Sequence, residues 1–215
     1  MKLSDYIVDY IAFRGTKHAF LVTGGAIAHV VDSLGRRADE RGDLSHICTQ
    51  HEQAAAMAAE AYSRLGKGIG IAMATSGPGA TNLITGICGS WFDSVPTLYI
   101  TGQVNTKESI SAAKAKPRQV GFQETDIVSI VKPITKFAAA VTKPEDIKFY
   151  LDKAYYFARE GRPGPVLLDI PVDVQVADIN PKKLKGFAHN KLSGTKEDSP
   201  QAVEKKIHHV IGLLK

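Results

Sequence analysis

The alternation of short apolar runs with amphipathic segments limits the fold of this chain more than any other feature. Four apolar runs of strand length lie near residues 18–23, 44–49, 68–75 and 96–102. The segments between them place apolar residues at helical spacing. This alternation predicts right-handed βαβ units. We therefore expect a three-layer, doubly wound α/β fold with a mostly parallel sheet and helices on both of its faces.

The alternation is interrupted once. Residues 102–123 are polar and basic and show no sustained period, which is typical of a functional or mobile loop. Strands are predicted again over 134–141 and 166–170, with a strong helix over 143–160 between them. The sheet is therefore expected to gain two more strands after the loop.

The composition changes after residue 175 and predicts a domain boundary. We expect one domain over 1–175, a linker over 176–198 and the start of a second, incomplete domain over 199–215. In the last segment Ser199 is predicted to cap a helix whose first residue is Pro200. Its apolar face has no following strand to cover it, which favours a shortened chain. A natural small subunit of a two-chain enzyme is the alternative.

Charge and cysteine content indicate the general class of protein. The net charge is +5, and eight lysines lie after residue 181, which indicates a solvated tail rather than a nucleic-acid site. No apolar run reaches the length of about 18 residues that a membrane span needs, and no signal-peptide pattern begins the chain. Cys48 and Cys88 lie in apolar runs without a CxxC motif, so both are expected to be buried free thiols. We expect a cytoplasmic protein with neither a membrane nor a nucleic-acid partner.

Glycine or polar residues follow each of the first four predicted strands. They are Gly24-Gly25, His51-Glu52, the turn 75–79 and Gly102-Gln103. Ligands of open parallel sheets bind at the carboxyl ends of the strands, near the point where the strand order reverses. These four features are therefore expected to meet at one edge of the sheet.

Two phosphate-binding interpretations of the glycine turns are weak. A dinucleotide fingerprint requires a third glycine three residues after Gly25, where Ala28 stands, so a nicotinamide-dependent dehydrogenase is disfavoured. The turn 75–82, "TSGPGATN", lacks the lysine of a Walker loop. Both turns still allow the backbone to approach a ligand closely.

Glu52 has two interpretations. Taken alone, a glutamate in the first turn of a helix is explained by the helix dipole. The helix that follows, however, has a closely packing apolar face predicted to consist of Ala54, Ala55, Ala58, Ala59 and Tyr62. Such packing would exclude water from Glu52, and a desolvated carboxyl group can give and take protons near neutral pH.

Five motifs in order resemble a known family. They are "HEQAAAMAAEAYSR", "ATSGPGATNLITGI", "DSVPTLYITGQV", "FQET" and "GRPGPVLLDIPVDVQ". Together they resemble the N-terminal, pyrimidine-binding domain of thiamine-diphosphate enzymes of the acetolactate synthase and pyruvate oxidase group. The resemblance covers about residues 1–175.

The resemblance implies roles for particular residues. Glu52 would contact N1′ of the aminopyrimidine of thiamine diphosphate and promote loss of the proton from C2 of the thiazolium ring. The pyrimidine pocket would be formed by Gly25, Ala26, Thr75, Pro78, Gly79 and Asn82. Phe122 and Gln123 would lie on the substrate side. The alternative for Phe122 is a core aromatic at the base of the loop.

The resemblance also implies what other parts of the enzyme supply. In this family the diphosphate and its Mg²⁺ are held by a separate domain through a Gly-Asp-Gly segment, which these 215 residues lack. The chain would then carry half a site in a homodimer or larger homo-oligomer. The implied reaction is decarboxylation of a 2-oxo acid, pyruvate, and transfer of its two-carbon unit to an acceptor.

Several functional points stay open at the level of the sequence. The loop before "FQET" is longer and more basic than usual, which leaves a carboligase acting on a keto-sugar as an alternative. A role for FAD is also open. A binding module without catalytic activity is disfavoured, because the motifs that carry the chemistry are present together.

Overall fold

The structure is a computed structural model that describes residues 1–66, 68–115, 117–188 and 198–214. The described residues form a six-stranded sheet in which each neighbouring pair of strands is parallel. In chain order the strands are β1 (His18–Leu21), β2 (Ser45–Cys48), β3 (Gly70–Ala74), β4 (Thr97–Gln103), β5 (Phe137–Ala140) and β6 (Val166–Pro171). Their order across the sheet is β2-β1-β3-β4-β6-β5.

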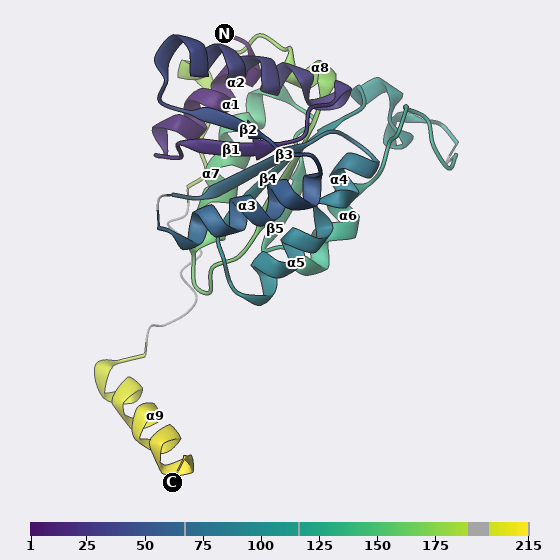
Figure 1. Cartoon of the computed structure of the whole chain (residues 1–215). Helices are drawn as coiled ribbons and strands as arrows, with labels where there is room; N and C mark the ends of the chain where they lie inside the picture. The colour runs from purple at the N-terminus through teal and green to yellow at the C-terminus, as the bar shows by residue number, and fades with distance from the viewer. Residues whose placement is uncertain (67, 116, 189–197, 215) are drawn as a thin grey trace.

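Helices cover both faces of the sheet (Figure 1). On one face lie α1 (Leu3–Phe13), α2 (Ala28–Arg41), α7 (Ile147–Arg159) and the short α8 (Val172–Gln175), and on the other α3 (Glu52–Arg64), α4 (Pro78–Asn82), α5 (Ile84–Phe92) and α6 (Ile127–Val131). The expected three-layer α/β fold is thus confirmed.

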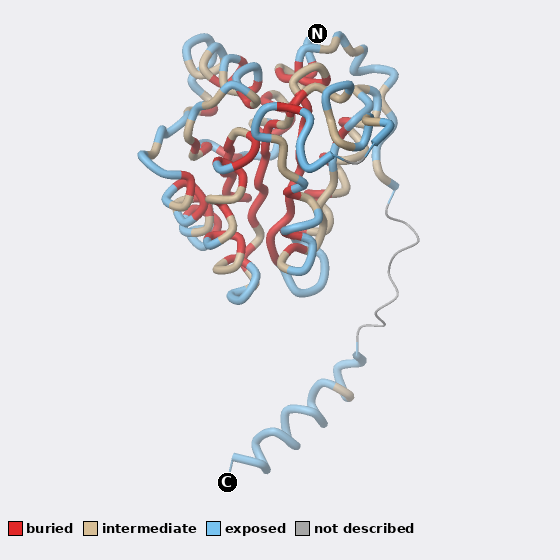
Figure 2. Tube along the Cα trace, turned by 90° about the vertical axis from the view of Figure 1, so that its right-hand side faces the viewer, coloured by how far each residue is buried: buried red, intermediate tan, exposed pale blue. Residues whose placement is uncertain are grey.

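Successive residues of a strand belong to opposite cores. In β3, Ile71 and Met73 pack with α1, α2 and α7, whereas Ala72 and Ala74 pack with the helices of the other face. Figure 2 shows buried strands at the centre of the domain, and β3, β4 and β6 are the strands buried along nearly their whole length. Because both faces are covered, these strands are continuous apolar runs, which explains why the sequence pattern predicted them.

Helix α3 packs closely against β3 and α5. A Cβ atom at Gly70 of β3 would lie 1.8 Å from the carbonyl oxygen of Ala59. A Cβ atom at Gly86 of α5 would lie 2.3 Å from Cβ of Ala56. Glycine at these two positions and alanine on α3 allow the elements to approach to this distance.

The face of α3 predicted from the sequence is partly wrong. Ala55, Ala59 and Tyr62 are buried as predicted, but Ala54 is exposed and Ala58 is only half-buried. The contact with α5 is made by Ala56 instead, which rotates the buried face away from Ala54.

Two further predictions differ from the structure. The segment between β3 and β4, expected to be helical, forms two helices, α4 and α5, with Leu83 between them. The cysteines are free but not buried, since Cys48 is exposed and Cys88 is half-buried. Cys48 ends β2, which is an edge strand and has a neighbour on one side only.

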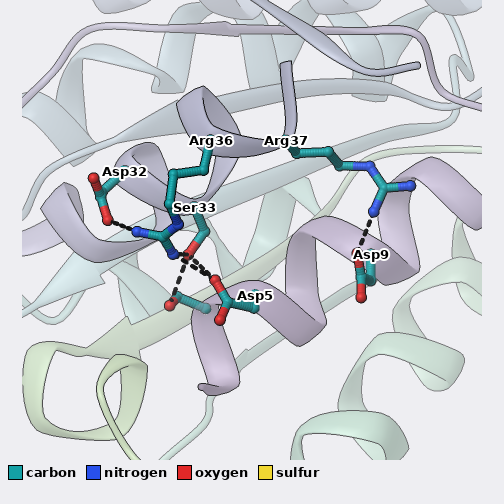
Figure 3. A network of polar contacts seen from close by, with 7 residues as sticks. Asp5, Asp9, Asp32, Ser33, Arg36 and Arg37 are labelled. Carbon is teal, nitrogen blue, oxygen red and sulfur yellow. Dashed lines mark hydrogen bonds and ion pairs between the residues drawn. The ribbon is translucent and has the colours of Figure 1, made fainter. Parts of the chain in front are cut away.

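Helices α1 and α2 are joined by a network of ion pairs (Figure 3). Arg36 contacts Asp5, 2.6 Å away, and also Asp32 on its own helix. Arg37 contacts Asp9 of α1 and, at 2.7 Å, Asp43. Each of these pairs is partly exposed, so each contributes little stability by itself.

Residues that follow α8 contact the N-terminal residues of the chain and α7. The backbone N–H of Leu3 donates to the carbonyl of Ala177, and that of Ile179 donates to the carbonyl of Met1, each over 3.0 Å. The ring of Phe187 lies 5.6 Å from that of Phe149 on α7. The division into 1–175, 176–198 and 199–215 stays a prediction, and residues 189–197 of the expected linker lie outside the described residues.

The last helix, α9 (Pro200–Leu213), begins as the sequence predicted. The hydroxyl of Ser199 accepts from the backbone N–H of Ala202 over 3.2 Å, and Pro200 is the first helical residue. None of its residues is buried among the described residues. In the part of the chain that the structure describes, no helix combines the length and the apolar character that crossing a membrane requires.

Candidate functional site

The polar and glycine residues that follow the strands meet at the carboxyl edge of the sheet. The 3₁₀ helix η1 (Gly25–Ile27) follows β1, Glu52 begins α3 after β2, and the turn 75–79 joins β3 to α4. The strand order reverses at β1, which has β2 on one side and β3 on the other. Such a reversal is where open parallel sheets bind their ligands.

Ala26 is held by contacts from three other segments. Its backbone N–H donates to the hydroxyl of Thr75 over 3.1 Å, and its carbonyl accepts from the amide of Gln175 over 2.6 Å. A Cβ atom at Gly102 of β4 would lie 1.9 Å from the same carbonyl. The backbone of η1 is therefore fixed relative to β3 and β4.

The preceding residue, Gly25, is open by contrast. A Cβ atom at Gly25 would have no atom of the described chain within 4 Å. Glycine at this position is therefore not required by packing within the domain. It leaves backbone accessible beside the fixed turn at Ala26 and Thr75.

Glu52 is buried and oriented by a neighbouring side chain. Its residue is only 9% exposed, and its Oε2 accepts from the Nδ2 of Asn82 over 2.9 Å. A Cβ atom at Gly79 would lie 3.3 Å from Oε1 of Glu52 and 2.8 Å from Cγ2 of Thr75. No described residue donates a hydrogen bond to Oε1, so this oxygen stays available on the side of Gly79.

His51 has a structural role at the start of α3. It is the N-cap residue, and its Nδ1 accepts from the backbone N–H of Gln53 over 3.1 Å. Its own carbonyl accepts from the hydroxyl of Thr49 over 2.9 Å. These contacts fix the first turn of the helix and hence the backbone from which Glu52 extends.

Most of the predicted site residues are brought together. Contacts connect Ala26, Glu52, Thr75, Gly79 and Asn82, and Pro78 begins α4 between them. Gln123 also reaches the group, because a Cβ atom at Gly77 would lie 2.6 Å from its carbonyl oxygen. Phe122 is 82% exposed, so the alternative of a core aromatic is wrong.

A buried acid near this edge was missed by the sequence analysis. Asp169 of β6 is 3% exposed and accepts from the hydroxyl of Thr101 over 2.6 Å. Its other oxygen accepts from Nε2 of Gln103 over 2.9 Å. Burial raises the pKa of Asp169 to about 7 despite these two bonds. The signal in the sequence was the single acid inside the apolar run "VLLDIP".

Two cavities lie away from this edge of the sheet. One of about 300 Å³ is lined by residues of α1 and α2, including Asp5 and Arg36. Another of about 480 Å³ is lined by residues around α7, including Asp152 and Tyr155. Neither contains Glu52, so the candidate site is recognised from its side chains rather than from a cavity.

Comparison with known protein families identifies the class of protein to which this fold and this site belong. The family described as "Thiamine pyrophosphate enzyme, N-terminal TPP binding domain" matches residues 1–130, and the chain belongs to this family. Thiamine pyrophosphate is another name for thiamine diphosphate.

Three relatives show which enzyme of this class the chain resembles. The chain is 41% identical over 174 residues to acetolactate synthase of Arthrospira platensis and 42% identical over 174 residues to the acetolactate synthase large subunit of Pyropia yezoensis. Each match covers 81% of this chain and 28% of the relative. A probable acetolactate synthase large subunit of Methanocaldococcus jannaschii is 40% identical over 196 residues, which are 91% of this chain and 31% of the relative. The chain thus spans less than a third of the length of these relatives.

Proposed function

We propose that this chain carries the pyrimidine-binding half of the active site of a thiamine-diphosphate-dependent carboligase of the acetolactate synthase type. The complete enzyme would decarboxylate pyruvate and transfer its two-carbon unit to a 2-oxo-acid acceptor. The observation that carries the proposal is the buried Glu52, oriented by Asn82 and open at Oε1 beside Gly79.

The described residues fit the aminopyrimidine end of the cofactor. Oε1 of Glu52 would hold a proton at the ring nitrogen N1′, and Asn82 would keep the carboxyl group turned toward it. Thr75 and Gln175 would keep the backbone at Ala26 in place, so that Gly25 can offer its backbone beside the ring. When bound, thiamine diphosphate supplies the electron sink for decarboxylation.

The diphosphate group of the cofactor and its Mg²⁺ would be bound by other parts of the complete enzyme. Among the residues that the structure describes, no three or more His, Cys, Asp or Glu side chains are grouped so as to hold a metal ion. As the family resemblance implies, we assign Mg²⁺ to another domain of the complete enzyme. No described residue is assigned to FAD.

We also propose that the complete enzyme is at least a dimer. Large apolar side chains are exposed on α3, at its C-cap and on α5, among them Met57, Leu65, Trp91 and Phe92. Exposed apolar side chains on these helices suit contact with a second subunit. Sedimentation of the complete enzyme as a monomer at micromolar concentration would contradict this assembly.

The role of Glu52 can be tested by exchange of the C2 proton. In the complete enzyme, Glu52→Gln is expected to slow C2 proton–deuterium exchange of bound thiamine diphosphate by about 10²–10⁴-fold, the usual contribution of a general acid or base. Glu60→Gln is the matched control, because Glu60 lies on the same helix and pairs with Arg64 instead. Equal exchange rates in wild type and Glu52→Gln would remove Glu52 from the mechanism.

A further inference from the structure

The connection between β4 and α6, residues 104–125, is here called the rim loop. It contains the short 3₁₀ helices η2 (Thr106–Glu108) and η3 (Ile110–Ala112) and ends in the segment "FQET". In Figure 1 it is the teal loop that projects beyond α4 and α6. Phe122 and Gln123 lie on its second arm, so the shape of the loop decides where both residues are presented.

One carboxylate connects the two arms of the rim loop. Oε1 of Glu124 accepts from the backbone N–H of Ile110 on the first arm over 2.6 Å. Oε2 accepts from the backbone N–H groups of Gly121 and Val120 on the second arm, over 3.3 and 3.4 Å. Bonds from backbone N–H groups to an ionised carboxylate are stronger than bonds between neutral groups.

The second arm also packs against the base of the loop and the glycine turn. A Cβ atom at Gly121 would lie 2.6 Å from Cγ1 of Val104, and one at Gly77 would lie 2.6 Å from the carbonyl oxygen of Gln123. Gln123 has a φ of 56°, which few residues other than glycine adopt. Strained backbone of this kind persists only where surrounding contacts impose it.

The end of the loop is anchored to the sheet. The amide of Gln103, at the end of β4, donates to the carbonyl of Thr125 and to Asp169, each over 2.9 Å. The side-chain oxygen of Gln103 accepts from the backbone N–H of Val104 over 3.1 Å. Both ends of the rim loop are therefore attached to one side chain, while Glu124 joins its arms further out.

We propose that Glu124 is a positioning residue, whose carboxylate joins the arms of the rim loop and thereby holds Gln123 against the glycine turn at Gly77 and fixes the backbone from which the exposed Phe122 extends. This inference rests on the proposed function, because it takes the substrate side of the same site to be formed by those two residues. Glu124 itself would not contact the cofactor. It would act on the affinity for the 2-oxo acid rather than on the affinity for thiamine diphosphate.

The first test measures amide hydrogen exchange by NMR in the 215-residue chain. Glu124→Gln leaves one acceptor oxygen where two are used, so the amides of Ile110, Val120 and Gly121 are expected to exchange at least about tenfold faster. Glu108→Gln is the matched control, because it removes the same charge from the same loop, and among the described residues the Glu108 carboxylate is hydrogen-bonded only to the side chain of Asn105. Unchanged exchange of all three amides in Glu124→Gln would overturn the proposal.

A second variant removes the donor instead of the acceptor. Ile110→Pro deletes the backbone N–H that donates to Glu124. Residue 110 is the first residue of η3, where proline is tolerated, and the preceding Ser109 already has the extended backbone that proline requires. The proposal requires that Ile110→Pro speed exchange at Val120 and Gly121, and that the double variant be no faster than the faster single variant. Fully additive effects would show that the two residues act separately.

The functional test uses the complete enzyme. Glu124→Gln is expected to raise KM for the 2-oxo acid by about tenfold, as loss of a charge-assisted bond does, with unchanged affinity for thiamine diphosphate. An equal loss of affinity for cofactor and substrate would indicate general damage and overturn the positioning role. The wild type separates the two hypotheses: an inactive wild-type enzyme contradicts the proposed function, whereas an active wild type with an unaffected variant contradicts only the role of Glu124.

Discussion

Replacement of Asp169 by asparagine should remove a pH dependence that the structure places in this one side chain. Asp169 is 3% exposed and holds the hydroxyl of Thr101 and the amide of Gln103. Burial raises its pKa from 3.8 to about 7, the two hydrogen bonds oppose this rise, and the nearby charge of Asp126 adds to it. An asparagine side chain at this position would still accept from Gln103 and could donate to Thr101, but it would not ionise.

The direction of the pH dependence of stability follows from the pKa values of Asp169 in the folded and unfolded chain. Since the pKa of Asp169 is higher in the folded chain than in the unfolded chain, the folded chain binds this proton more tightly. The stability that this adds is complete below about pH 4 and is lost as the pH rises to about 7. At about 1.4 kcal/mol for each pKa unit, the rise to about 7 corresponds to about 4 kcal/mol in all, of which about 2 to 3 kcal/mol fall between pH 5 and pH 8.

The assay is urea unfolding of the wild type and Asp169→Asn at a series of pH values. The fluorescence of Trp91, the single tryptophan of the chain, reports unfolding. Groups common to both proteins cancel in the difference between their unfolding free energies. We expect Asp169→Asn to gain about 2 to 3 kcal/mol over the wild type between pH 5 and pH 8.

A second variant tests whether Asp169 causes this pH dependence of stability. Thr101→Val removes one of the hydrogen bonds that lower the pKa of Asp169, so the loss of stability should move to higher pH. Parallel pH curves for the wild type and Asp169→Asn would refute the reasoning, because they would show that Asp169 takes up no proton on folding.

Three further predictions concern the cap of α3, the glycines and the half-site. His51→Ala should lower the free energy of unfolding by about 1 kcal/mol through loss of the N-cap, whereas His51→Asn should retain it, as urea titration will show. Gly70→Ala should lower the free energy of unfolding by about 3 kcal/mol, because its Cβ would overlap the backbone of Ala59. Gly25→Ala should change that free energy by less than about 0.5 kcal/mol, yet it should weaken cofactor binding in the complete enzyme. Calorimetry should find weak binding of thiamine diphosphate to this chain, with no gain from Mg²⁺; tight, Mg²⁺-dependent binding would contradict the half-site.

The positions of the strands were predictable because both faces of the sheet are buried. Strands such as β3 are therefore continuous apolar runs, and turn residues mark their ends. The meeting of Ala26, Thr75 and Glu52 was predictable for a related reason, since parallel strands place their carboxyl ends at one edge. The roles of these residues came from the resemblance to the family rather than from the pattern itself.

Contacts between residues far apart in the sequence were not predictable. Asp169 and Gln103 are 66 residues apart, and Glu124 and Ile110 are 14 apart. The choice of Ala56 rather than Ala54 for the buried face of α3 likewise depends on Gly86, which belongs to a different helix. Such choices require knowledge of which neighbour each element meets.

The alternation of strands and helices, the turns between them and the edge at which the candidate site forms can thus be read from the amino-acid order, because they follow from local periodicity and from residues adjacent in the chain. Three features depend instead on the folded chain: Asn82 orients Glu52, Gln103 and Asp169 anchor the rim loop, and Cys48 is exposed on an edge strand. They depend on it because hydrogen bonding and burial are set by the packing of elements that meet only after folding.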